Sequence, residues 1–250
     1  MKFYLNDTEF IETSEGIDIS ISMGGENADT KAWYVNSPVI EPVRTTEFTG
    51  SVAEGGSVNF RNISFNPHGN GTHTECLGHI TKEVYSINEH LKEFVFEALL
   101  VTLQPVETDN GDFVITRQEL EKATNSTSIK SLIIRTLPNG SDKLLFDYSS
   151  TNPPYIDVDC INLLDSMGVE HLLIDLPSVD KELDNGVLAM HHAFWQIPNN
   201  PQYHKTITEL IFVPNHVIDG HYILSLHVAP FENDASPSRP ILYPIKTKKS

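Results

Sequence analysis

The chain has 250 residues, a hydrophobic content of 39% and a charged content of 20%, as expected for a globular protein with one or two cores. Its formal net charge of −17 argues against partners such as nucleic acid or an anionic membrane surface, whose phosphates would repel it. No run of about eighteen apolar residues predicts a membrane span, and the N-terminus lacks a signal-peptide core. We therefore expect a cytoplasmic protein.

Short apolar runs rich in β-branched residues predict strands along the chain, and amphipathic segments between them predict helices. The expected strands cover residues 2–5, 16–22, 57–65, 94–103, 131–137, 171–176, 209–213 and 221–229. The expected helices cover 86–94, 116–124 and 159–169, with Ser86, Thr116 and Asp159 as their N-terminal caps and Gly168 as the stop of the third. Because no linker or repeat divides residues 1–250, the pattern indicates a single α/β domain.

The segment 66–80, NPHGNGTHTECLGHI, places three histidines and a glutamate within twelve positions. Imidazole nitrogens and carboxylates are the ligands of zinc and similar divalent ions. His73 and Glu75 are two residues apart, so in an extended backbone both side chains point to the same face. His79 follows four residues after Glu75 and could enter the same pocket after a turn. The alternative is a polar loop with incidental histidines.

The two cysteines, Cys76 and Cys160, are too few for a secreted disulfide scaffold. Cys76 lies within the histidine cluster, so a role as a soft ligand or as a nucleophile has to be considered. Because it alternates out of phase with His73 and Glu75, it points to the opposite face of an extended segment. The sequence therefore favours packing as the role of Cys76.

Two later segments place polar side chains among apolar neighbours. His191 and His192 lie in VLAMHHAFWQ, where a helix would bury one of them, and Glu209 lies in the apolar run TITELIFV. An unpaired polar group in such surroundings costs free energy, and a metal ion would satisfy both sites. A buried ion pair or a hydrogen-bonded core histidine is the alternative. Phe194 and Trp195, beside His191, could form an aromatic wall for a planar substrate, although packing is favoured.

A helix followed by a buried strand ends at Asp175, and the turn Pro177–Asp180 comes next. Loops after strands of α/β proteins commonly line the ligand-binding cleft. Asp180 could lie in such a cleft, or it could cap the next helix.

Taken in order, these segments resemble the cyclase family, which includes bacterial kynurenine formamidases and isatin hydrolases. The family motif reads H-x-G-T-H-x-D-x-P-x-H, and here Gly71-Thr72-His73 matches its G-T-H. The resemblance extends from about residue 36 to the end, and Asp175 and Ser178 match a D-x-P-S-x-D stretch. It implies a swivelling β/β/α fold, a divalent metal site, usually for zinc or manganese, and a dimer or tetramer. The implied metal ligands are His73, Glu75, His191 and Glu209, and the implied catalytic residue is His79.

Three positions depart from the family motif. Gly69 occupies the position of the first histidine, while His68 lies one residue earlier; a bulge could bring His68 into the ligand position, or water could fill it. Glu75 replaces the aspartate and is one methylene longer. Leu77 replaces the proline and loosens the turn before His79. The departures predict a divergent member of the family, with one or two metal ions.

The expected chemistry is hydrolysis of a non-peptide C–N bond of a small molecule, such as an amide, formamide or lactam, as in arylformamidases. The metal would activate a water molecule and polarise the carbonyl, and His79 would shuttle the proton to the leaving group. Two alternatives remain: a metal-binding or interaction protein without catalytic activity, and a thiol hydrolase that uses Cys76.

Overall fold

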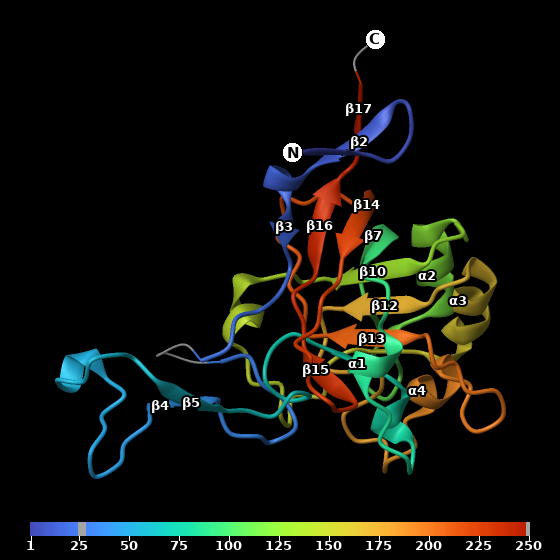
Figure 1. Ribbon diagram of the computed structural model, residues 1–250. Coiled ribbons are helices and arrows are strands. Elements are labelled where there is room, and N and C mark those ends of the chain that lie inside the picture. The colour runs from blue at the N-terminus through green and yellow to red at the C-terminus, as the bar shows by residue number, and fades with distance from the viewer. Residues whose placement is uncertain (25–28, 249–250) are drawn as a thin grey trace.

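A nine-stranded mixed sheet forms the centre of the protein in a computed structural model, which describes residues 1–24 and 29–248. The upright strands at one end of the sheet run across the horizontal strands at the other, so the sheet is strongly curled (Figure 1). This arrangement confirms the predicted α/β fold. The strands follow the order β15 (Ala235–Pro237), β6 (His73–Glu75), β13 (Thr206–Glu209), β12 (His171–Ile174), β10 (Ser131–Thr136), β7 (Val95–Leu103), β14 (Gly220–Ser225), β16 (Ile241–Pro244) and β3 (Ile17–Asp18).

The middle of the sheet is parallel and its flanks are antiparallel. Strands β13, β12, β10 and β7 run parallel, whereas β6, β15, β14, β16 and β3 each pair in the antiparallel sense. Every residue of β10 and β12 is buried. Strands buried on both faces contain near-continuous apolar runs, here 132–134 in β10 and 172–174 in β12, and these runs made the two strands clear in the sequence.

In the part of the chain that the structure describes, four short α-helices accompany the sheet: α1 (Ile87–His90), α2 (Arg117–Thr124), α3 (Ile161–Met167) and α4 (Ala189–Phe194). Helices α2, α3 and α4 lie together on one side of the body (Figure 1). The predicted cap of α2 is confirmed, since Thr116 accepts a hydrogen bond from the backbone N–H of Glu119. Gly168 ends α3 as predicted, with φ +78°, a conformation that favours glycine. No helix in the described residues is long and apolar enough to span a bilayer.

One predicted cap and two predicted strands are wrong. Ser86 occupies the N-cap position of α1 as predicted, but its side chain makes no capping hydrogen bond, and the helix is only one turn long. Asp159 lies inside a 3-10 turn, η5 (Val158–Cys160), whose cap is Asp157. The strand expected at 209–213 instead ends at Glu209, because Leu210 has φ +54° and leaves the extended conformation. Of the strand expected at 16–22, only Ile17–Asp18 pairs within the sheet.

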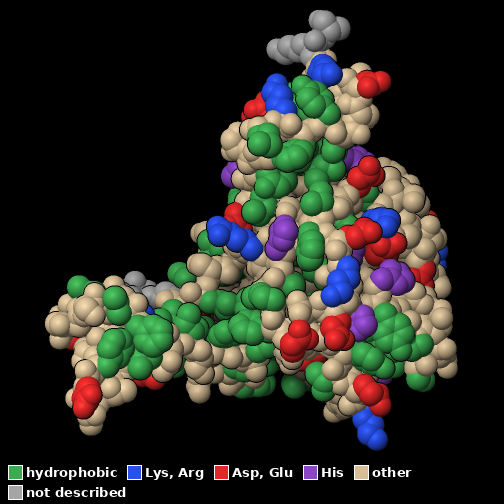
Figure 2. Space-filling model, in the orientation of Figure 1, with side chains coloured by type: hydrophobic (Ala, Val, Ile, Leu, Met, Phe, Trp, Pro, Cys, Tyr) green, Lys and Arg blue, Asp and Glu red, His purple; other side chains and the backbone are tan. Residues whose placement is uncertain are grey.

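Three smaller sheets accompany the main one among the described residues. The first contains β1 (Lys2–Tyr4), β2 (Glu9–Glu12) and β17 (Lys246–Thr247), and the second contains β8 (Val106–Glu107), β9 (Phe113–Ile115) and β11 (Tyr155–Ile156). The third is a hairpin of β4 (Val39–Pro42) and β5 (Arg61–Ser64), which projects from the body as an arm (Figure 1). Exposed hydrophobic side chains gather on the arm (Figure 2), among them Val39, Phe60 and Ile63.

His171, the first residue of β12, is a buried histidine outside the predicted site. Only 4% of the residue is exposed, its Nδ1 lies 2.9 Å from Oγ1 of Thr206, and its ring centroid lies 4.1 Å from that of Phe96. Burial, aided by the charges of His204 and Lys130, lowers its pKa from the ordinary 6.5 to about 4. His171 is therefore neutral in the folded protein at pH values at which it is protonated in the unfolded chain.

The low pKa of His171 predicts a loss of stability in mild acid. Between pH 6.5 and about 4 the unfolded chain binds more protons at this residue than the folded protein does, so stability falls as the pH falls. From pH 7 to pH 5 this residue should cost about 2 kcal/mol of unfolding free energy. The unfolding free energies of wild-type protein and of His171→Gln are measured by urea unfolding in chelator at pH 7 and at pH 5. The contribution of His171 is the difference between the losses in the two proteins. Equal losses in the two proteins would contradict the assignment.

Candidate metal and catalytic site

The antiparallel edge of the sheet brings three of the predicted ligands together. Strand β6 carries His73 and Glu75 and lies between β13 and β15, and Glu209, the last residue of β13, pairs directly with His73. Residues directly opposite in an antiparallel pair point to the same face, as do residues two apart in one strand. All three side chains therefore meet on one face, as the i, i+2 spacing predicted for His73 and Glu75.

His73 is completely buried and has one ring nitrogen without a hydrogen-bond partner. Its Nδ1 lies 3.1 Å from the carbonyl oxygen of Gly71, a residue with φ +70°. Because a carbonyl only accepts, Nδ1 carries the proton and Nε2 presents a lone pair. This Nε2 lies 3.5 Å from Oε2 of Glu209 and has no hydrogen bond within the described structure. A buried lone pair with this orientation is what a metal ligand requires.

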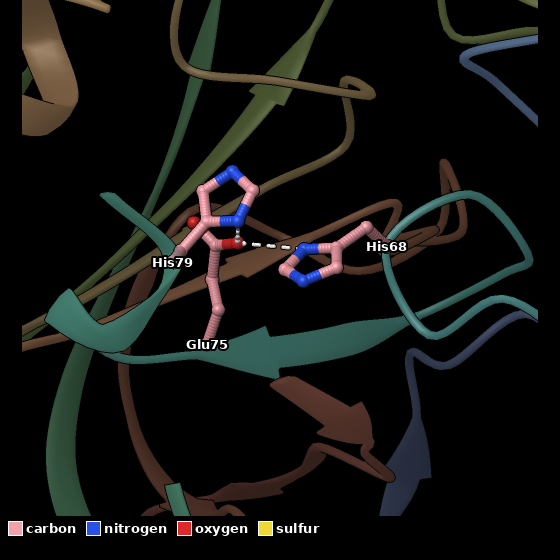
Figure 3. Close-up of side chains that lie close together, drawn as sticks. All are labelled: His68, Glu75 and His79. Carbon is pink, nitrogen blue, oxygen red and sulfur yellow. Dashed lines mark ion pairs between the residues drawn. The ribbon is translucent and has the colours of Figure 1, made fainter. Parts of the chain in front are cut away.

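Glu75 is the centre of the cluster. Its Oε1 lies 3.0 Å from Nε2 of His191, and its Oε2 lies 3.0 Å from Nδ1 of His68 and 3.9 Å from Nδ1 of His79. Figure 3 shows the imidazoles of His68 and His79 converging on this carboxylate from two different loops. Within the described residues, Oε2 has no hydrogen bond of good geometry. A buried carboxylate between imidazoles is suited to bind a cation.

Helix α4 supplies His191, and Asp180 fixes its orientation. Oδ1 of Asp180 accepts from the N–H of Met190 at 2.7 Å, and Oδ2 accepts from the N–H of His191 at 3.1 Å. Oδ2 also lies 2.5 Å from Nδ1 of the His191 ring. Asp180 therefore fills both roles that the sequence left open, since it binds the first turn of the helix and belongs to the site. The other histidine of the pair, His192, is outside the cluster.

His68 reaches the cluster through a turn and not through the suggested bulge. Oδ1 of Asn66 accepts from the N–H groups of His68 and Gly69, at 2.9 and 3.0 Å, which tightens the turn. Gly69 itself faces Val35, where an added Cβ would lie 2.6 Å from a methyl carbon. The rings of His68 and His79 stack with centroids 4.2 Å apart. His68, one residue before the family position, thus lies beside Glu75.

His79 comes from a 3-10 turn, η3 (Leu77–Ile80), which begins one residue after β6 ends. Gly78 lies against Tyr85, so an added Cβ would be 2.3 Å from the Tyr85 carbonyl oxygen, and this close contact sets the path of the turn. The side chain of His79 is 30% exposed, more than that of His68, His73 or His191. It is therefore the histidine of the cluster with the most access to solvent.

The sequence reasoning missed Asp234. Its Oδ2 lies 2.7 Å from Nε2 of His68 and 3.5 Å from Nδ1 of His79. Asp234 lies in the closing stretch that resembles the family. Because another acidic residue, Glu232, lies two positions earlier in the same loop, no sequence pattern distinguished Asp234 as a site residue. Only the pairing of β15 with β6 brings it to the site.

Two groups of side chains in the described structure have ligand atoms close enough to hold an ion. One contains His68, Glu75 and His79, and the other contains His73, Glu75 and Glu209. Glu75 belongs to both, and within each group the ligand atoms lie within 4.8 Å of one another. The nitrogen and oxygen donors, together with the buried free atoms of His73 and Glu75, fit a divalent metal. His191 is in neither group but contacts Glu75 directly.

The charges of the cluster shift the pKa values of its members. Burial lowers the pKa of His191, but hydrogen bonds to Asp180 and Glu75 outweigh it and raise the pKa to about 10. For His68, burial likewise lowers the pKa, but the carboxylates of Asp234 and Glu75, 2.7 and 3.0 Å from its two ring nitrogens, raise it to about 10. Burial raises the pKa of Glu75, but the neighbouring imidazoles hold it well below the usual value. The site is therefore a set of paired charges, and a bound cation would replace the protons on the imidazoles.

The cluster opens into a cleft of about 480 Å³. Its walls include apolar and charged side chains: Trp33, Val35, Asn66, Ser178, Lys181, Glu182, Asp184 and Leu188. Phe194 and Trp195 are fully buried, and Nε1 of Trp195 donates to the Lys205 carbonyl oxygen, so they pack in the core as the sequence favoured. The aromatic wall of the cleft is Trp33, which no sequence pattern singled out.

Cys76 is buried on the opposite face, as its phase predicted. Its Sγ lies 3.2 Å from the carbonyl oxygen of Tyr85, and burial raises its pKa to about 12. Such a thiol is protonated at neutral pH and is a poor nucleophile. The geometry therefore disfavours the thiol-hydrolase alternative.

Known sequences related to this chain include hydrolases. A family model described as a putative cyclase matches residues 17–181. A kynurenine formamidase of Bacillus thuringiensis (strain Al Hakam) is 29% identical over 237 residues, which cover 94% of this chain and all of that relative. A kynurenine formamidase of Bacillus anthracis is 27% identical over 237 residues, with the same coverage of both chains.

Solved structures share the fold at lower sequence identity. Isatin hydrolase A from Labrenzia aggregata, bound to benzyl benzoate, has a TM-score of 0.65 at 15% identity and covers 91% of this chain and 93% of its own. A structure described as a potential metal-dependent hydrolase with cyclase activity has a TM-score of 0.63 at 14% identity. The match covers 91% of this chain and 96% of that chain. The family model matches well over half of the chain, and the fold agrees with it. The protein belongs to the cyclase family of hydrolases.

Proposed function

We propose that this protein hydrolyses a non-peptide C–N bond of a small molecule, an amide, formamide or lactam, with the help of a divalent metal. The observation that carries the proposal is the buried Glu75 carboxylate, which is shared by two groups of ligand-type side chains. Three members of these groups, His68, His79 and Glu209, line a cleft. The names of the relatives support the same class of bond, since kynurenine formamidases and an isatin hydrolase are among them.

The predicted metal ligands are His68, His73, Glu75, His191 and Glu209. Zinc and manganese both accept this set of imidazole and carboxylate donors, for one ion or two. A metal bound here supplies Lewis acidity, which activates water and polarises a carbonyl group. The free lone pair of His73 supports its role, because Gly71 holds the other ring nitrogen in the protonated form. Asp180 holds His191 in the same way.

His79 is the proposed acid–base residue. It lies beside Glu75 but is the histidine of the cluster most open to the cleft, so it can reach a bound substrate. An imidazole there can accept a proton from the attacking water and return it to the leaving nitrogen as the C–N bond breaks. The nitrogen then departs as a neutral amine, and the carbonyl carbon becomes a carboxylic acid, which releases its remaining proton to solvent at neutral pH.

The cleft favours a compact substrate with an aromatic part. The cleft has a volume of about 480 Å³, which is in the range of sites that bind small molecules. Trp33 offers an aromatic surface. Lys181, also in the wall, is already paired with Asp112, and its Nζ lies 2.6 Å from Oδ2 of that residue. The expected cytoplasmic location and the expected dimer or tetramer stay predictions.

Metal analysis combined with a hydrolysis screen tests this proposal. We expect purified protein to contain zinc or manganese, to hydrolyse formanilide or isatin, and to lose that activity in chelator until metal is restored. The control is a catalytically unrelated protein of similar acidity, carried through the same chelation and reloading steps. Metal binding without turnover of either substrate would favour the alternative of a binding protein. Activity that survives chelation but not alkylation would favour a thiol mechanism.

A further inference from the structure

Asp234 is fixed to the site by the backbone around it. The N–H of Cys76 donates to the carbonyl oxygen of Asp234 at 3.0 Å, and the next residue, Ala235, pairs with Glu75 across β15 and β6. The side chain of Asp234 is only 14% exposed. Its carboxylate is thus held at the edge of the metal cluster by the same strands that position Glu75.

His68 is bound at both ring nitrogens between two carboxylates. Its Nε2 lies 2.7 Å from Oδ2 of Asp234, and its Nδ1 lies 3.0 Å from Oε2 of Glu75. His191 is bound in the same manner, with Asp180 at one nitrogen and Glu75 at the other. Two carboxylate–imidazole pairs therefore approach Glu75 from different parts of the chain.

The two histidines differ in how firmly the backbone holds them. His191 lies in helix α4 and is fully packed, whereas His68 lies in a turn and its side chain is 21% exposed. Asn66 fixes the backbone of that turn but not the torsion of the His68 ring. The ring itself contacts Asp234 through Nε2, Glu75 through Nδ1 and the stacked ring of His79, and the contact with Asp234 is the shorter of the two to a carboxylate.

We propose that Asp234 is a positioning residue that turns Nδ1 of His68 toward the metal. Oδ2 of Asp234 accepts a hydrogen bond from Nε2–H of the imidazole, so Nδ1 lies on the side of Glu75 and presents its lone pair there once a cation displaces its proton. Carboxylates that hold a metal-binding histidine in this way are known to tune the affinity of the site. The inference rests on the proposed function insofar as it requires a divalent metal in this cluster.

The test is metal affinity in a double-mutant cycle. Zinc affinity of wild type, Asp234→Asn, His68→Ala and the double variant is measured by competition with a chelating dye. We expect Asp234→Asn to weaken zinc binding by about 10- to 100-fold, and to have no further effect once His68 is alanine. Glu232→Gln is the matched control, since this exposed carboxylate two residues away hydrogen-bonds to Asn88 and should leave affinity unchanged.

Thermal unfolding of the zinc-free variants shows whether a loss of zinc affinity comes from a misplaced His68 ring or from a less stable fold. We expect Asp234→Asn to unfold within a few degrees of Glu232→Gln. Unchanged zinc affinity in Asp234→Asn, or an equal loss with and without His68, would overturn the inference. Wild-type protein that binds zinc but hydrolyses nothing would overturn only the proposed function, and wild-type protein that binds no metal would overturn both.

Discussion

Replacing Glu75 with glutamine is expected to remove bound metal and to lower turnover by about 10³-fold or more. Glu75 is the residue common to both candidate groups of the described structure, so no arrangement of one or two ions avoids it. Both of its oxygens face imidazoles, Oε1 toward His191 and Oε2 toward His68. Metal assistance contributes several kcal/mol to such reactions, and each ~1.36 kcal/mol is a factor of ten in rate.

The matched control is Glu75→Asp, which restores the carboxylate found in the family motif. We expect this variant to keep measurable metal, because the charge remains and only one methylene is lost. Elemental analysis and formanilide hydrolysis of both variants, with folding checked by circular dichroism, provide the measurement. Glutamine protein with the metal content of wild type would contradict the central place of Glu75.

Local spacing in the sequence placed His73, Glu75 and His79 in one candidate site, whereas His191 and Glu209 were included because of their apolar surroundings and the family resemblance. His73 and Glu75 lie on the same face because side chains two residues apart in a strand point the same way, and Cys76 is buried on the other face. The central strands were clear because both of their faces are covered. The wrong strand at 209–213 had the right composition, but Leu210 adopts φ +54°, a property of this backbone that composition does not encode.

Apart from His191 and Glu209, which the family resemblance assigned to the site, the contacts between distant segments were not predicted from the sequence. His68 and Asp234 are separated by 166 positions and meet only because β15 pairs with β6. Asp180 could be described only as a cap or a cleft residue until the structure placed it on His191. Trp33 likewise became a wall of the cleft through tertiary packing. Each of these residues acts through a partner that no local pattern specifies.

Replacing His79 with alanine distinguishes a role in proton transfer from a role as a metal ligand. If His79 moves protons for a bound substrate, His79→Ala should keep its metal and lose roughly 10²–10⁴-fold in turnover. The geometry supports this reading, because Nδ1 of His79 is 3.9 Å from Oε2 of Glu75, farther than that of His68, and the side chain lines the cleft.

The competing reading is that His79 is a ligand, since it also completes a group with His68 and Glu75. Metal content and turnover are therefore measured on the same samples, with His192→Ala as the control for loss of a neighbouring histidine outside the cluster. Recovery of part of the activity when imidazole is added to His79→Ala would support proton transfer, because a free imidazole can enter the vacated space. Loss of metal together with activity would assign His79 to the metal, and full activity would remove it from the mechanism.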